Sequence, residues 1–369
     1  MRVLLIPELY PTDENPIAGI FINDQIKAIQ KFADVVVYNT NPFYRGVYSQ
    51  LPDVDYYDFH LFNRKPPNIL KPFLYRFWEA QALKLAQKIP DIDLVHLHGA
   101  ALRGNMALRF AQNREIPLVV TEHTGPWSAI SSRPAIFKRV KKVFKHAKVV
   151  MPVSHHLKDE MISSGVEIDR KEVLGNPIDG DLYKLRTSSL STVKRILFVG
   201  RLDEFKGAMR TLKAYHSIVS DNSDWKLLML GAGPEADEIK SYIQNHSLNN
   251  NVEFIEAVFD RTQLANYYRS ASFLVFPSRF ESFGLVAAEA MATGLPVLCT
   301  NQTGPLDYSL PENSLSINPD SIKDIAEGMS KMIDKIQGFK PETIRSSALN
   351  KFGIQAYAEK LEAVYSSTL

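Results

Sequence analysis

Two glutamates lie eight positions apart in the segment RFESFGLVAAEA, residues 279–290. Glu281 precedes the pair Phe283-Gly284, and Glu289 follows it within a run of alanines. An apolar run comes directly before the segment, so we expect a strand to end there and a helix of small residues to begin. The N–H groups at a helix start bind anions, and carboxylates beside them can accept hydrogen bonds from sugar hydroxyls. Alternatively, Glu281 is only an acid at a helix start and Glu289 is a solvated helical residue.

Two cations follow an earlier apolar run in the same half of the chain. In FVGRLDEFKG, Gly200 permits a tight turn, and Arg201 and Lys206 come directly after it. Arginine presents a planar fork of donors and lysine a mobile point charge, and together they suit a diphosphate. The alternative is that both residues are solvated surface charges.

A glycine-rich loop, LLMLGAGPEADEIK, places Gly231 and Gly233 between an expected strand and an expected helix. This spacing approaches a dinucleotide-binding fingerprint, with Glu253 and Glu256 about where an acid would bind a ribose. The fingerprint normally opens the first βαβ unit of a domain, whereas this loop opens the second. The alternative is that the glycines let a turn lie close to a ligand or to a neighbouring helix.

Short apolar runs alternate with segments of helical periodicity along both halves of the chain. Continuous apolar runs are typical of parallel strands covered on both faces, and the helical segments between them indicate βαβ units. Two series of units predict an α/β protein with two Rossmann-like, doubly wound parallel-sheet domains facing a central cleft. The predicted strands are 3–6, 35–38, 94–97, 118–121 and 149–153, followed by 195–199, 226–230, 252–255, 273–276 and 296–299. Ligands bind outside the carboxyl ends of such strands, where the loops described above lie.

A polar stretch without helical or strand periodicity separates the two series. We therefore place the first domain at 1–178, a linker at 179–194 and the second domain at 195–353. The last segment, 354–369, has the apolar stripe of an amphipathic helix.

Composition describes a near-neutral globular protein of 369 residues, long enough for about two domains. Hydrophobic residues make up 45 % and the formal net charge is +2, so composition implies no nucleic-acid partner. The single cysteine, Cys299, lies in an apolar run and is expected to be a buried strand thiol rather than a nucleophile. No stretch approaches the roughly 18 apolar residues of a membrane span, and the first apolar run is short for a signal peptide. We expect a cytoplasmic protein.

Taken in order, the motifs resemble family 4 of the retaining glycosyltransferases, which have the GT-B fold. The matching motifs of the second half are GRL at 200–202, KG at 206–207, GAG at 231–233 and the pair Glu281 and Glu289. Those of the first half are DIDLVHLHG at 91–99, TEHTG at 121–125, VSHHLKDEM at 153–161 and GNPID at 175–179. Any single piece is unspecific, whereas the ordered set is specific and spans nearly the whole chain.

The resemblance implies roles for individual residues. Arg201 and Lys206 would hold the donor diphosphate, Glu289 would bind the nucleotide ribose, and Glu281 would contact the donor sugar. His123 would lie next to the transferred sugar, so the implied catalytic residues are His123, Glu281, Arg201 and Lys206. The implied donor-binding residues are Gly19, Gly200, Arg201, Lys206, Gly231, Gly233, Val258, Glu281, Phe283, Gly284, Leu285 and Glu289. The last helix, 354–369, would pack back on the first domain.

Histidines elsewhere in the first half allow other interpretations. His123 is alternatively a satisfied core histidine. His96 and His98 have a spacing that metal ligands use, but a zinc site needs more ligands nearby, so we interpret them as structural.

Three positions depart from the pattern of the family. Ala18 precedes Gly19 where many members have two glycines, and Glu256 stands where a glycine is common. The loop at 303–307 reads TGPLD in place of a sequence like Gly-Gly-x-x-Glu. These departures concern the acceptor, the base and the sugar, and none touches the residues expected to hold the diphosphate.

The implied reaction moves a hexosyl unit from a nucleotide-diphosphate sugar to an acceptor hydroxyl with retention. A UDP-sugar is the favoured donor, GDP-mannose comes next, and the product would be a cell-surface glycan, a polysaccharide or a glycolipid. No metal or other cofactor is expected, because Arg201, Lys206 and the helix start at Gly284 can stabilise the diphosphate charge. The alternatives are another GT-B enzyme, such as a nucleotide-sugar epimerase or a phosphorylase, and a non-catalytic two-domain sugar-binding protein.

A basic segment, RPAIFKRVKKVFKHAK at 133–148, combines an apolar helical stripe with six Lys or Arg residues from Lys138 onwards. No acid occurs between His123 and Lys158. One interpretation is a core-packed helix with a solvated basic back. The other is a surface that binds anionic lipid headgroups and brings the enzyme to a lipid-carried or membrane-proximal acceptor at the inner face of the membrane.

Overall fold

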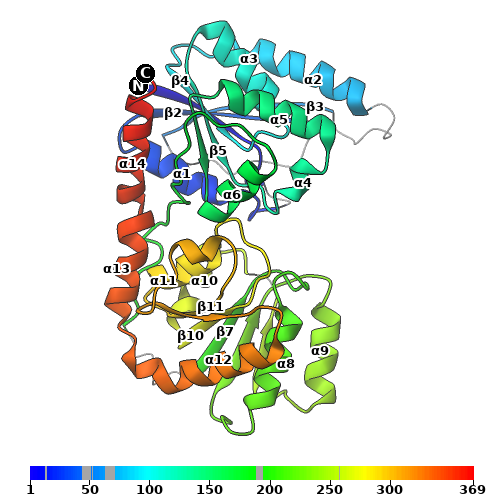
Figure 1. Ribbon diagram of the computed structural model, residues 1–369, viewed down its shortest axis with the longest axis vertical. Coiled ribbons are helices and arrows are strands. Elements are labelled where there is room, and N and C mark those ends of the chain that lie inside the picture. The colour runs from blue at the N-terminus through cyan, green and yellow to red at the C-terminus, as the bar shows by residue number, and fades with distance from the viewer. Residues whose placement is uncertain (13–14, 44–50, 52, 63–70, 188–193, 257) are drawn as a thin grey trace. The chain divides into compact units, whose positions relative to one another are not determined.

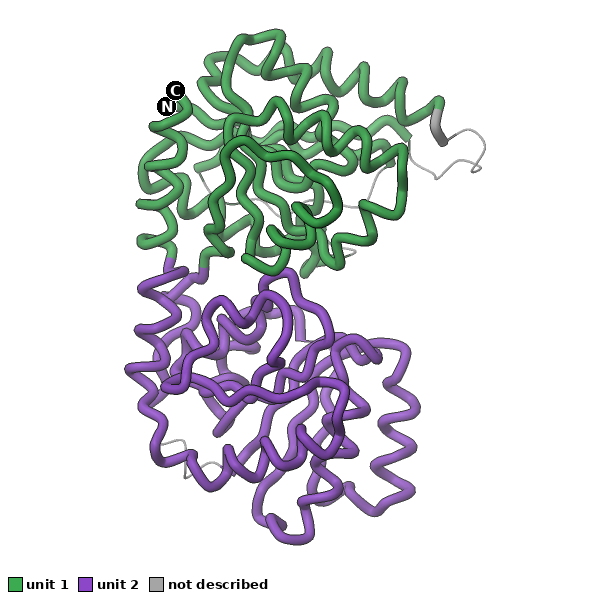
Figure 2. The backbone as a smooth tube through the Cα atoms, viewed as in Figure 1, with its two compact units in different colours: residues 1–177, 354–369 green, residues 178–353 purple. Residues whose placement is uncertain are grey.

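The computed structural model describes the chain except for residues 13–14, 44–50, 52, 63–70, 188–193 and 257. The chain forms two units (Figure 2). Unit 1 comprises Met1–Pro177 and Ile354–Leu369, and unit 2 comprises Ile178–Gly353. The chain thus leaves unit 1 once and returns to it for its last helix.

Unit 1 is built on a parallel sheet with the strand order β3-β2-β1-β4-β5-β6 (Figure 1). Its strands are β1 (Arg2–Pro7), β2 (Asp34–Phe43), β3 (Asp55–Phe62), β4 (Leu94–His98), β5 (Leu118–Glu122) and β6 (Val149–Pro152). Its helices are α1 (Phe21–Ile29), α2 (Lys71–Ala86), α3 (Gly104–Arg114), α4 (Ser128–Ser131), α5 (Pro134–His146), α6 (His155–Ser163) and α14 (Ile354–Ser366). The register places His98, the last residue of β4, opposite Pro7 of β1 and Thr121 of β5.

The last helix completes the core of unit 1. Tyr357, Leu361 and Tyr365 of α14 are buried in one cluster with Val3 and Leu5 of β1. Helix α14 also packs against α1, and Figure 1 shows the two helices side by side. The apolar stripe seen in the sequence is therefore part of the unit 1 interior.

Unit 2 repeats the architecture with the strand order β12-β11-β10-β7-β8-β9. Its strands are β7 (Arg195–Val199), β8 (Lys226–Leu230), β9 (Val252–Ile255), β10 (Phe273–Phe276), β11 (Val297–Thr300) and β12 (Ser314–Ile317). Its helices are α8 (Ala208–Ile218), α9 (Ala236–Asn245), α10 (Arg261–Arg269), α11 (Leu285–Ala292), α12 (Ile322–Lys335) and α13 (Pro341–Phe352), with 3-10 turns η2 (Gly304–Asp307) and η3 (Ile336–Gly338). The predicted doubly wound parallel sheets are confirmed in both units. Cys299 of β11 is fully buried, as predicted, and burial raises the pKa of its thiol to about 12.

Two edge strands and the linker differ from the prediction. Strand β3 was missed because it is half exposed and mixes polar with aromatic residues, and β12 because serines alternate with its apolar residues, so it is not a continuous apolar run. The expected linker at 179–194 is not a separate segment over its first nine residues. Residues 179–187 lie in unit 2, where Tyr183 and Arg186 are buried. The rest of the expected linker, apart from Lys194, lies outside the described residues.

Candidate functional site

The glycine-rich loop after β8 packs against the loop after β7. The N–H of Gly200 donates to Leu230 O at 3.1 Å, and the N–H of Leu202 donates to Ala232 O at 3.0 Å. A Cβ on Gly231 would lie 1.9 Å from Gly200 O, and a Cβ on Gly233 would lie 2.4 Å from Leu202 O. The glycines therefore let two backbones approach closely, which supports the packing interpretation over a dinucleotide fingerprint.

The two cations of the first loop have different surroundings. Lys206 is drawn inward, and its Nζ donates to Glu281 Oε1 in an ion pair whose side chains are 31 % and 12 % exposed, respectively. Arg201 is 68 % exposed, and its Nε lies 3.1 Å from Asp203 Oδ2. Asp203 also accepts the backbone N–H of Lys206 at 2.9 Å and so fixes the turn. The structure brings Lys206 to the predicted acid, while Arg201 stays at the surface beside Asp203.

The start of α11 is held in place by a buried tyrosine. The Tyr308 hydroxyl lies 2.9 Å from Phe283 O and 2.7 Å from Gly284 O, and its single proton is shared between these two carbonyls. Gly284 has φ +88°, and a Cβ there would lie 2.6 Å from the same hydroxyl, so a glycine is required. The ring of Phe283 is buried against Tyr308 and Phe352. The first N–H groups of α11, from Leu285 onwards, follow this fixed turn and are the candidate anion site.

The loop after β11 braces the Glu281 segment from the other side. The N–H of Gly304 donates to Glu281 O at 3.0 Å, and the N–H of Glu281 donates to Thr303 Oγ1 at 3.2 Å. A Cβ on Gly304 would lie 2.5 Å from Ser282 O. The Thr303-Gly304 turn, which departs from the family pattern, thus positions the acid.

Glu289 is not a solvated helical residue, because it is only 6 % exposed. Tyr268 donates its hydroxyl to Glu289 Oε2 at 3.2 Å, and Arg261 Nη2 lies 3.9 Å from Oε1. Arg261 also lies over the ring of Tyr183, 5.5 Å from its centroid. Burial first and then the charge of Glu289 raise the pKa values of Tyr183 and Tyr268, so both hydroxyls stay protonated and able to donate. Glu281 and Glu289 therefore have separate sets of partners on the two sides of the α11 start.

Sequence reasoning missed the side chains around Glu289. Asp260 caps α10 by accepting the N–H groups of Thr262 and Gln263, so Arg261 becomes the first helical residue, and Tyr268 follows two turns later. Tyr183 comes from the segment expected to be linker. No local motif links these residues to Glu289, so only the fold could reveal them.

The remaining predicted contacts in unit 2 lie after β9. Val258 is partly buried in the turn between β9 and α10. Glu256, which stands where a ribose-binding acid was considered, is exposed and lies 3.7 Å from Lys240 in a surface ion pair. This contact gives the dinucleotide interpretation no support.

In unit 1, the predicted residues Gly19 and His123 each pack closely against neighbouring segments. Gly19 has φ +69°, and a Cβ there would lie 2.3 Å from Leu9 O, so the loop before α1 closes tightly over the end of β1. His123 directly follows β5, and its ring lies 4.5 Å from the ring of Phe21, the first residue of α1. Its Nε2 lies 3.0 Å from Nδ1 of His98.

His96 is a structural residue. Its Nε2 lies 2.7 Å from Thr121 Oγ1, and its Nδ1 lies 2.6 Å from the hydroxyl of Tyr365 on α14. Burial lowers the pKa of its ring to about 3, so it is neutral. Within the described part of the chain, no group of three or more His, Cys, Asp or Glu residues is placed to hold a metal ion.

Two acids that the sequence did not single out, Glu8 and Glu122, lie at the carboxyl ends of strands of the unit 1 sheet. Glu122 accepts the N–H groups of His123 at 3.0 Å, Thr124 at 2.9 Å and Ala100 at 3.2 Å, and so ties the ends of β4 and β5 together. Glu8, directly after β1, is partly exposed as a residue, but its Oε2 is buried without a hydrogen-bond partner among the described residues. Burial and the nearby charge of Glu122 raise the pKa of Glu8 to about 7.

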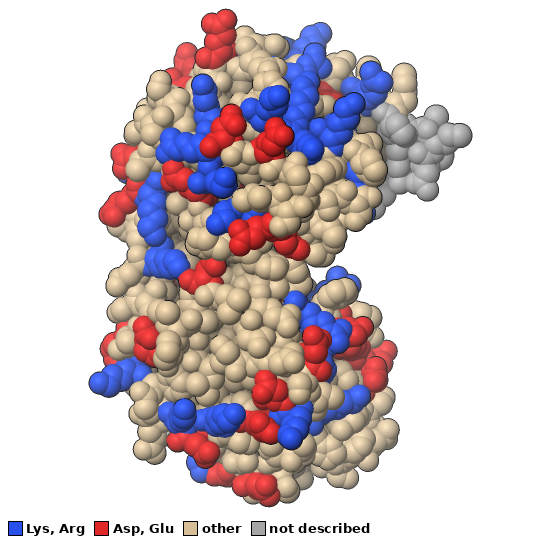
Figure 3. Space-filling model, viewed as in Figure 1, with Lys and Arg blue, Asp and Glu red and all other residues tan. Residues whose placement is uncertain are grey.

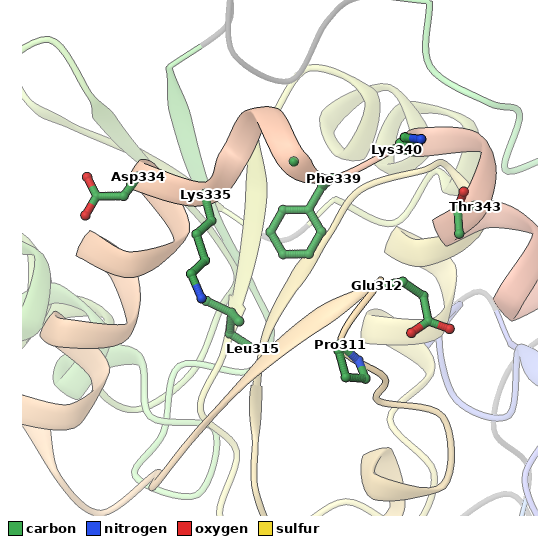
Figure 4. A pocket seen from close by; sticks show the side chains of 9 residues that line it. Pro311, Glu312, Leu315, Asp334, Lys335, Phe339, Lys340 and Thr343 are labelled. Atoms are coloured by element: carbon green, nitrogen blue, oxygen red, sulfur yellow. The ribbon is translucent and has the colours of Figure 1, made fainter.

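A pocket of about 460 Å³ lies elsewhere in unit 2 (Figure 4). It is lined by residues of 311–315 and 334–343, with the ring of Phe339 between Lys335 and Thr343 in the close-up. None of the predicted site residues lines it.

Both halves of the chain match glycosyltransferase families. Residues 21–182 match the family described as Glycosyltransferase Family 4, and residues 185–342 match Glycosyl transferases group 1. TuaC of Bacillus subtilis (strain 168), named for teichuronic acid biosynthesis, is 26 % identical over 93 % of this chain and 91 % of its own length. CapM of Staphylococcus aureus, named as a capsular polysaccharide biosynthesis glycosyltransferase, is 30 % identical over 56 % of this chain and 54 % of its own.

Solved structures share the fold over the full chain. Sucrose-phosphate synthase from Thermosynechococcus elongatus has a TM-score of 0.79 at 20 % identity, covering 100 % of this chain and 98 % of its own. Anabaena HepE in complex with UDP and glucose has a TM-score of 0.77 at 18 % identity, with 100 % of both chains covered. The chain therefore belongs to the family 4 glycosyltransferases and has their GT-B fold.

Proposed function

We propose that the protein transfers a hexosyl unit, with retention, from a nucleotide-diphosphate sugar to an acceptor hydroxyl. A UDP-sugar is the favoured donor and GDP-mannose the next. The observation that carries this proposal is the Lys206–Glu281 ion pair beside the start of α11. It places a cation, a carboxylate and free helix N–H groups together, and these are the groups that a sugar diphosphate needs.

The proposed division of labour follows from the surroundings of each residue. Lys206 and the start of α11 would bind the β-phosphate, and Glu281, released from Lys206, would accept sugar hydroxyls. Glu289, held by Tyr268 and Arg261, would bind the ribose. The exposed Arg201 would swing onto the diphosphate from the surface.

In the proposed reaction, the bond between C1 of the sugar and the diphosphate oxygen breaks. The acceptor oxygen bonds to C1 on the same face, and its proton passes to a phosphate oxygen of the leaving group. The protein contributes positioning and stabilisation of the developing diphosphate charge, without a protein nucleophile. We propose that Lys206 and α11 supply this stabilisation without a metal ion.

A thermal-shift screen against UDP, GDP, ADP and their sugars tests the donor. We expect UDP and UDP-sugars to raise the melting temperature most, since the complex of the related fold in HepE contains UDP. Product analysis with and without a glycan acceptor separates the alternatives. An epimerase would change the sugar without an acceptor, a phosphorylase would need phosphate, and a binding protein would show no turnover. No shift with any nucleotide would refute the proposed donor site.

The acceptor is proposed from the relatives and from one surface of unit 1. TuaC is named for teichuronic acid biosynthesis and CapM for capsular polysaccharide biosynthesis, so we propose that this chain acts in polysaccharide or cell-surface glycan synthesis. Such glycans commonly grow at a membrane. No described helix is both long enough and apolar enough to cross a membrane.

Helices α2, α3 and α5, with Lys148 just after α5, present a basic surface. It is defined here as Arg76, Arg109, Lys138, Arg139, Lys141, Lys142, Lys145 and Lys148, all of them exposed. Helix α5 buries Val140, Val143 and Phe144, so the centre of its apolar stripe belongs to the core, and its lysines and arginine face outward. Burial raises the pKa of Glu79, and the charges of Arg139, Arg109 and Arg76 partly oppose that shift. Arginines of three helices therefore lie around one carboxylate. Figure 3 shows Lys and Arg side chains over this part of unit 1.

Exposed aromatic rings accompany these cations. Phe73 and Phe77 of α2 are 72 % and 48 % exposed and lie one turn apart on the same face as Arg76. Cations with exposed aromatic rings suit an anionic lipid surface, where each basic residue contributes up to about 1 kcal/mol. We therefore propose that the basic surface docks on an anionic membrane and brings the enzyme to a lipid-carried or membrane-proximal glycan.

Vesicle co-sedimentation tests the membrane proposal. Binding to phosphatidylglycerol-containing vesicles should fall as salt rises, because exposed charges are screened. Replacing Lys138, Lys141, Lys142 and Lys145 by Gln should weaken binding by more than about tenfold, since each cation contributes up to about 1 kcal/mol. The matched control replaces four exposed lysines of unit 2, Lys323, Lys331, Lys335 and Lys340, by Gln and should bind normally. If the wild-type protein does not bind anionic vesicles even at low salt, the membrane proposal is refuted and a soluble acceptor becomes the better proposal.

A further inference from the structure

The histidine at the predicted acceptor side has an unusual partner, a second histidine. Nε2 of His123 lies 3.0 Å from Nδ1 of His98, and the two rings are nearly parallel at 18°. The outer nitrogens, Nδ1 of His123 and Nε2 of His98, are buried and have no hydrogen-bond partner among the described residues. Buried polar atoms in native proteins nearly always have a hydrogen-bond partner, so we expect a ligand or a water to bind these two outer nitrogens.

The contact couples the proton positions of the two rings. Burial lowers the pKa of His123 to about 3 and holds that of His98 well below its usual range, so each ring carries one proton. If Nδ1 of His98 donates, the proton of His123 must sit on its own Nδ1. If Nε2 of His123 donates, the proton of His98 must sit on its own Nε2. Both rings are therefore the same tautomer, and the two outer nitrogens are always one donor and one acceptor.

The structure assigns His98 as the positioning residue of His123: through the His98–His123 hydrogen bond, it fixes the ring orientation of His123 and decides whether the outer Nδ1 donates to or accepts from a sugar hydroxyl. This inference rests on the proposed function for the role of His123. Reversing both outer nitrogens takes a relay of protons in one direction: Nδ1 of His123 releases its outer proton, the inner proton passes from Nδ1 of His98 to Nε2 of His123, and Nε2 of His98 takes up a proton. The net charge of the pair is the same before and after. A hydroxyl of the donor or the acceptor sugar can bond to Nδ1 of His123 in both states, because it accepts when Nδ1 carries a proton and donates when Nδ1 is bare.

His96 does not share this role, although it lies on the same strand, β4. Both of its ring nitrogens are bonded, to Thr121 and to Tyr365. Tyr365 therefore offers a matched control. Tyr365→Phe removes one buried hydrogen bond at His96 and leaves the His98–His123 contact in place.

Ring nitrogen NMR of histidine-labelled, ligand-free protein tests the coupling without any need for activity. Long-range proton–nitrogen spectra distinguish a protonated from a bare ring nitrogen, and His123→Phe and His98→Phe assign the signals. We expect His98 and His123 to show the same tautomer in the wild type, and the His123 signals to change in His98→Phe but not in Tyr365→Phe. Opposite tautomers in the wild type, or unchanged His123 signals in His98→Phe, would overturn the inference.

Steady-state kinetics then separates positioning from folding. His98→Phe should lower kcat by about tenfold or more, because a misoriented group is costly near the reacting atoms. His98→Asn keeps a polar atom near the Nδ1 position and should recover part of the loss. Nucleotide affinity, which depends on unit 2, should stay within about twofold, and Tyr365→Phe should keep its kcat. A wild type without turnover on any nucleotide sugar would refute the proposed function, whereas the NMR result would still decide the coupling.

Discussion

Replacing Lys206 by Ala should weaken nucleoside diphosphate binding without unfolding the protein. The Nζ of Lys206 is paired with Glu281, and both side chains lie near the surface of unit 2 rather than in its core. A hydrogen bond to a charged group contributes about 1.5–3 kcal/mol, and each 1.4 kcal/mol corresponds to about tenfold in affinity. The dissociation constant should therefore rise by about 10- to 150-fold.

The loss of UDP affinity should approach the upper end of that range, because Lys206→Ala leaves the Glu281 carboxylate without its cation. The Glu281 side chain is only 12 % exposed in the intact protein. Without Lys206 its carboxylate loses its cation and repels the incoming diphosphate. Adding Glu281→Gln to Lys206→Ala should remove this repulsion and recover part of the affinity. The double-mutant cycle should then show a coupling energy of about 0.5–3 kcal/mol, the usual range for residues in contact.

Isothermal titration calorimetry with UDP measures this prediction directly, and thermal melts check that each variant is folded. Lys331→Ala, at an exposed position on α12, is the matched control and should bind UDP like the wild type. Arg201→Ala should lose less than Lys206→Ala, since Arg201 is exposed and must be drawn in from the surface. Affinity of Lys206→Ala within twofold of the Lys331→Ala control would refute the assignment of the diphosphate site.

Three other predictions concern the acids and the metal. Glu289→Gln should weaken UDP and UDP-sugar alike, whereas Glu281→Gln should weaken the UDP-sugar more than UDP; calorimetry showing one profile for both variants would contradict the separate roles. Turnover should survive EDTA, and activity lost on chelation and restored by Mg²⁺ or Mn²⁺ would show that a metal is needed. Glu8 has a folded-state pKa of about 7 against an ordinary value of 4.5, so its ionisation opposes folding. This destabilisation is absent below about pH 4.5 and complete above about pH 7, on the order of 3 kcal/mol. Glu8→Gln should therefore raise the melting temperature more at pH 8 than at pH 5. An equal rise at the two pH values would contradict a raised pKa for Glu8.

The fold was largely predictable because its signal is local. Central strands such as β1, β4 and β10 are covered on both faces, so they read as continuous apolar runs. The edge strand β3 has one partner strand and several exposed residues, so its pattern is not that of a buried parallel strand. Periodicity thus reveals the strands in the middle of each sheet and fails at the edges.

The candidate site was predictable only in part. Lys206, Glu281 and Glu289 stand out because charged residues at strand ends and among alanines are unusual for their surroundings. The groups that hold them did not stand out: Tyr308 sits after a 3-10 turn and Tyr268 within a helix. Their roles come from contacts between residues 21 to 25 positions apart, which no short motif encodes.

The return of the chain to unit 1 sets the order in which the protein is completed during synthesis. Residues 354–366 leave the ribosome after all of unit 2, yet they supply Tyr357, Leu361 and Tyr365 to the unit 1 core. Until then unit 1 exposes the apolar surface that α14 covers, and His96 lacks the tyrosine hydroxyl that bonds its Nδ1. Unit 2, which is continuous at 178–353, has no such dependence. The first unit to be translated is therefore the last to be finished, and a nascent chain holds all of unit 2 before the core of unit 1 is closed.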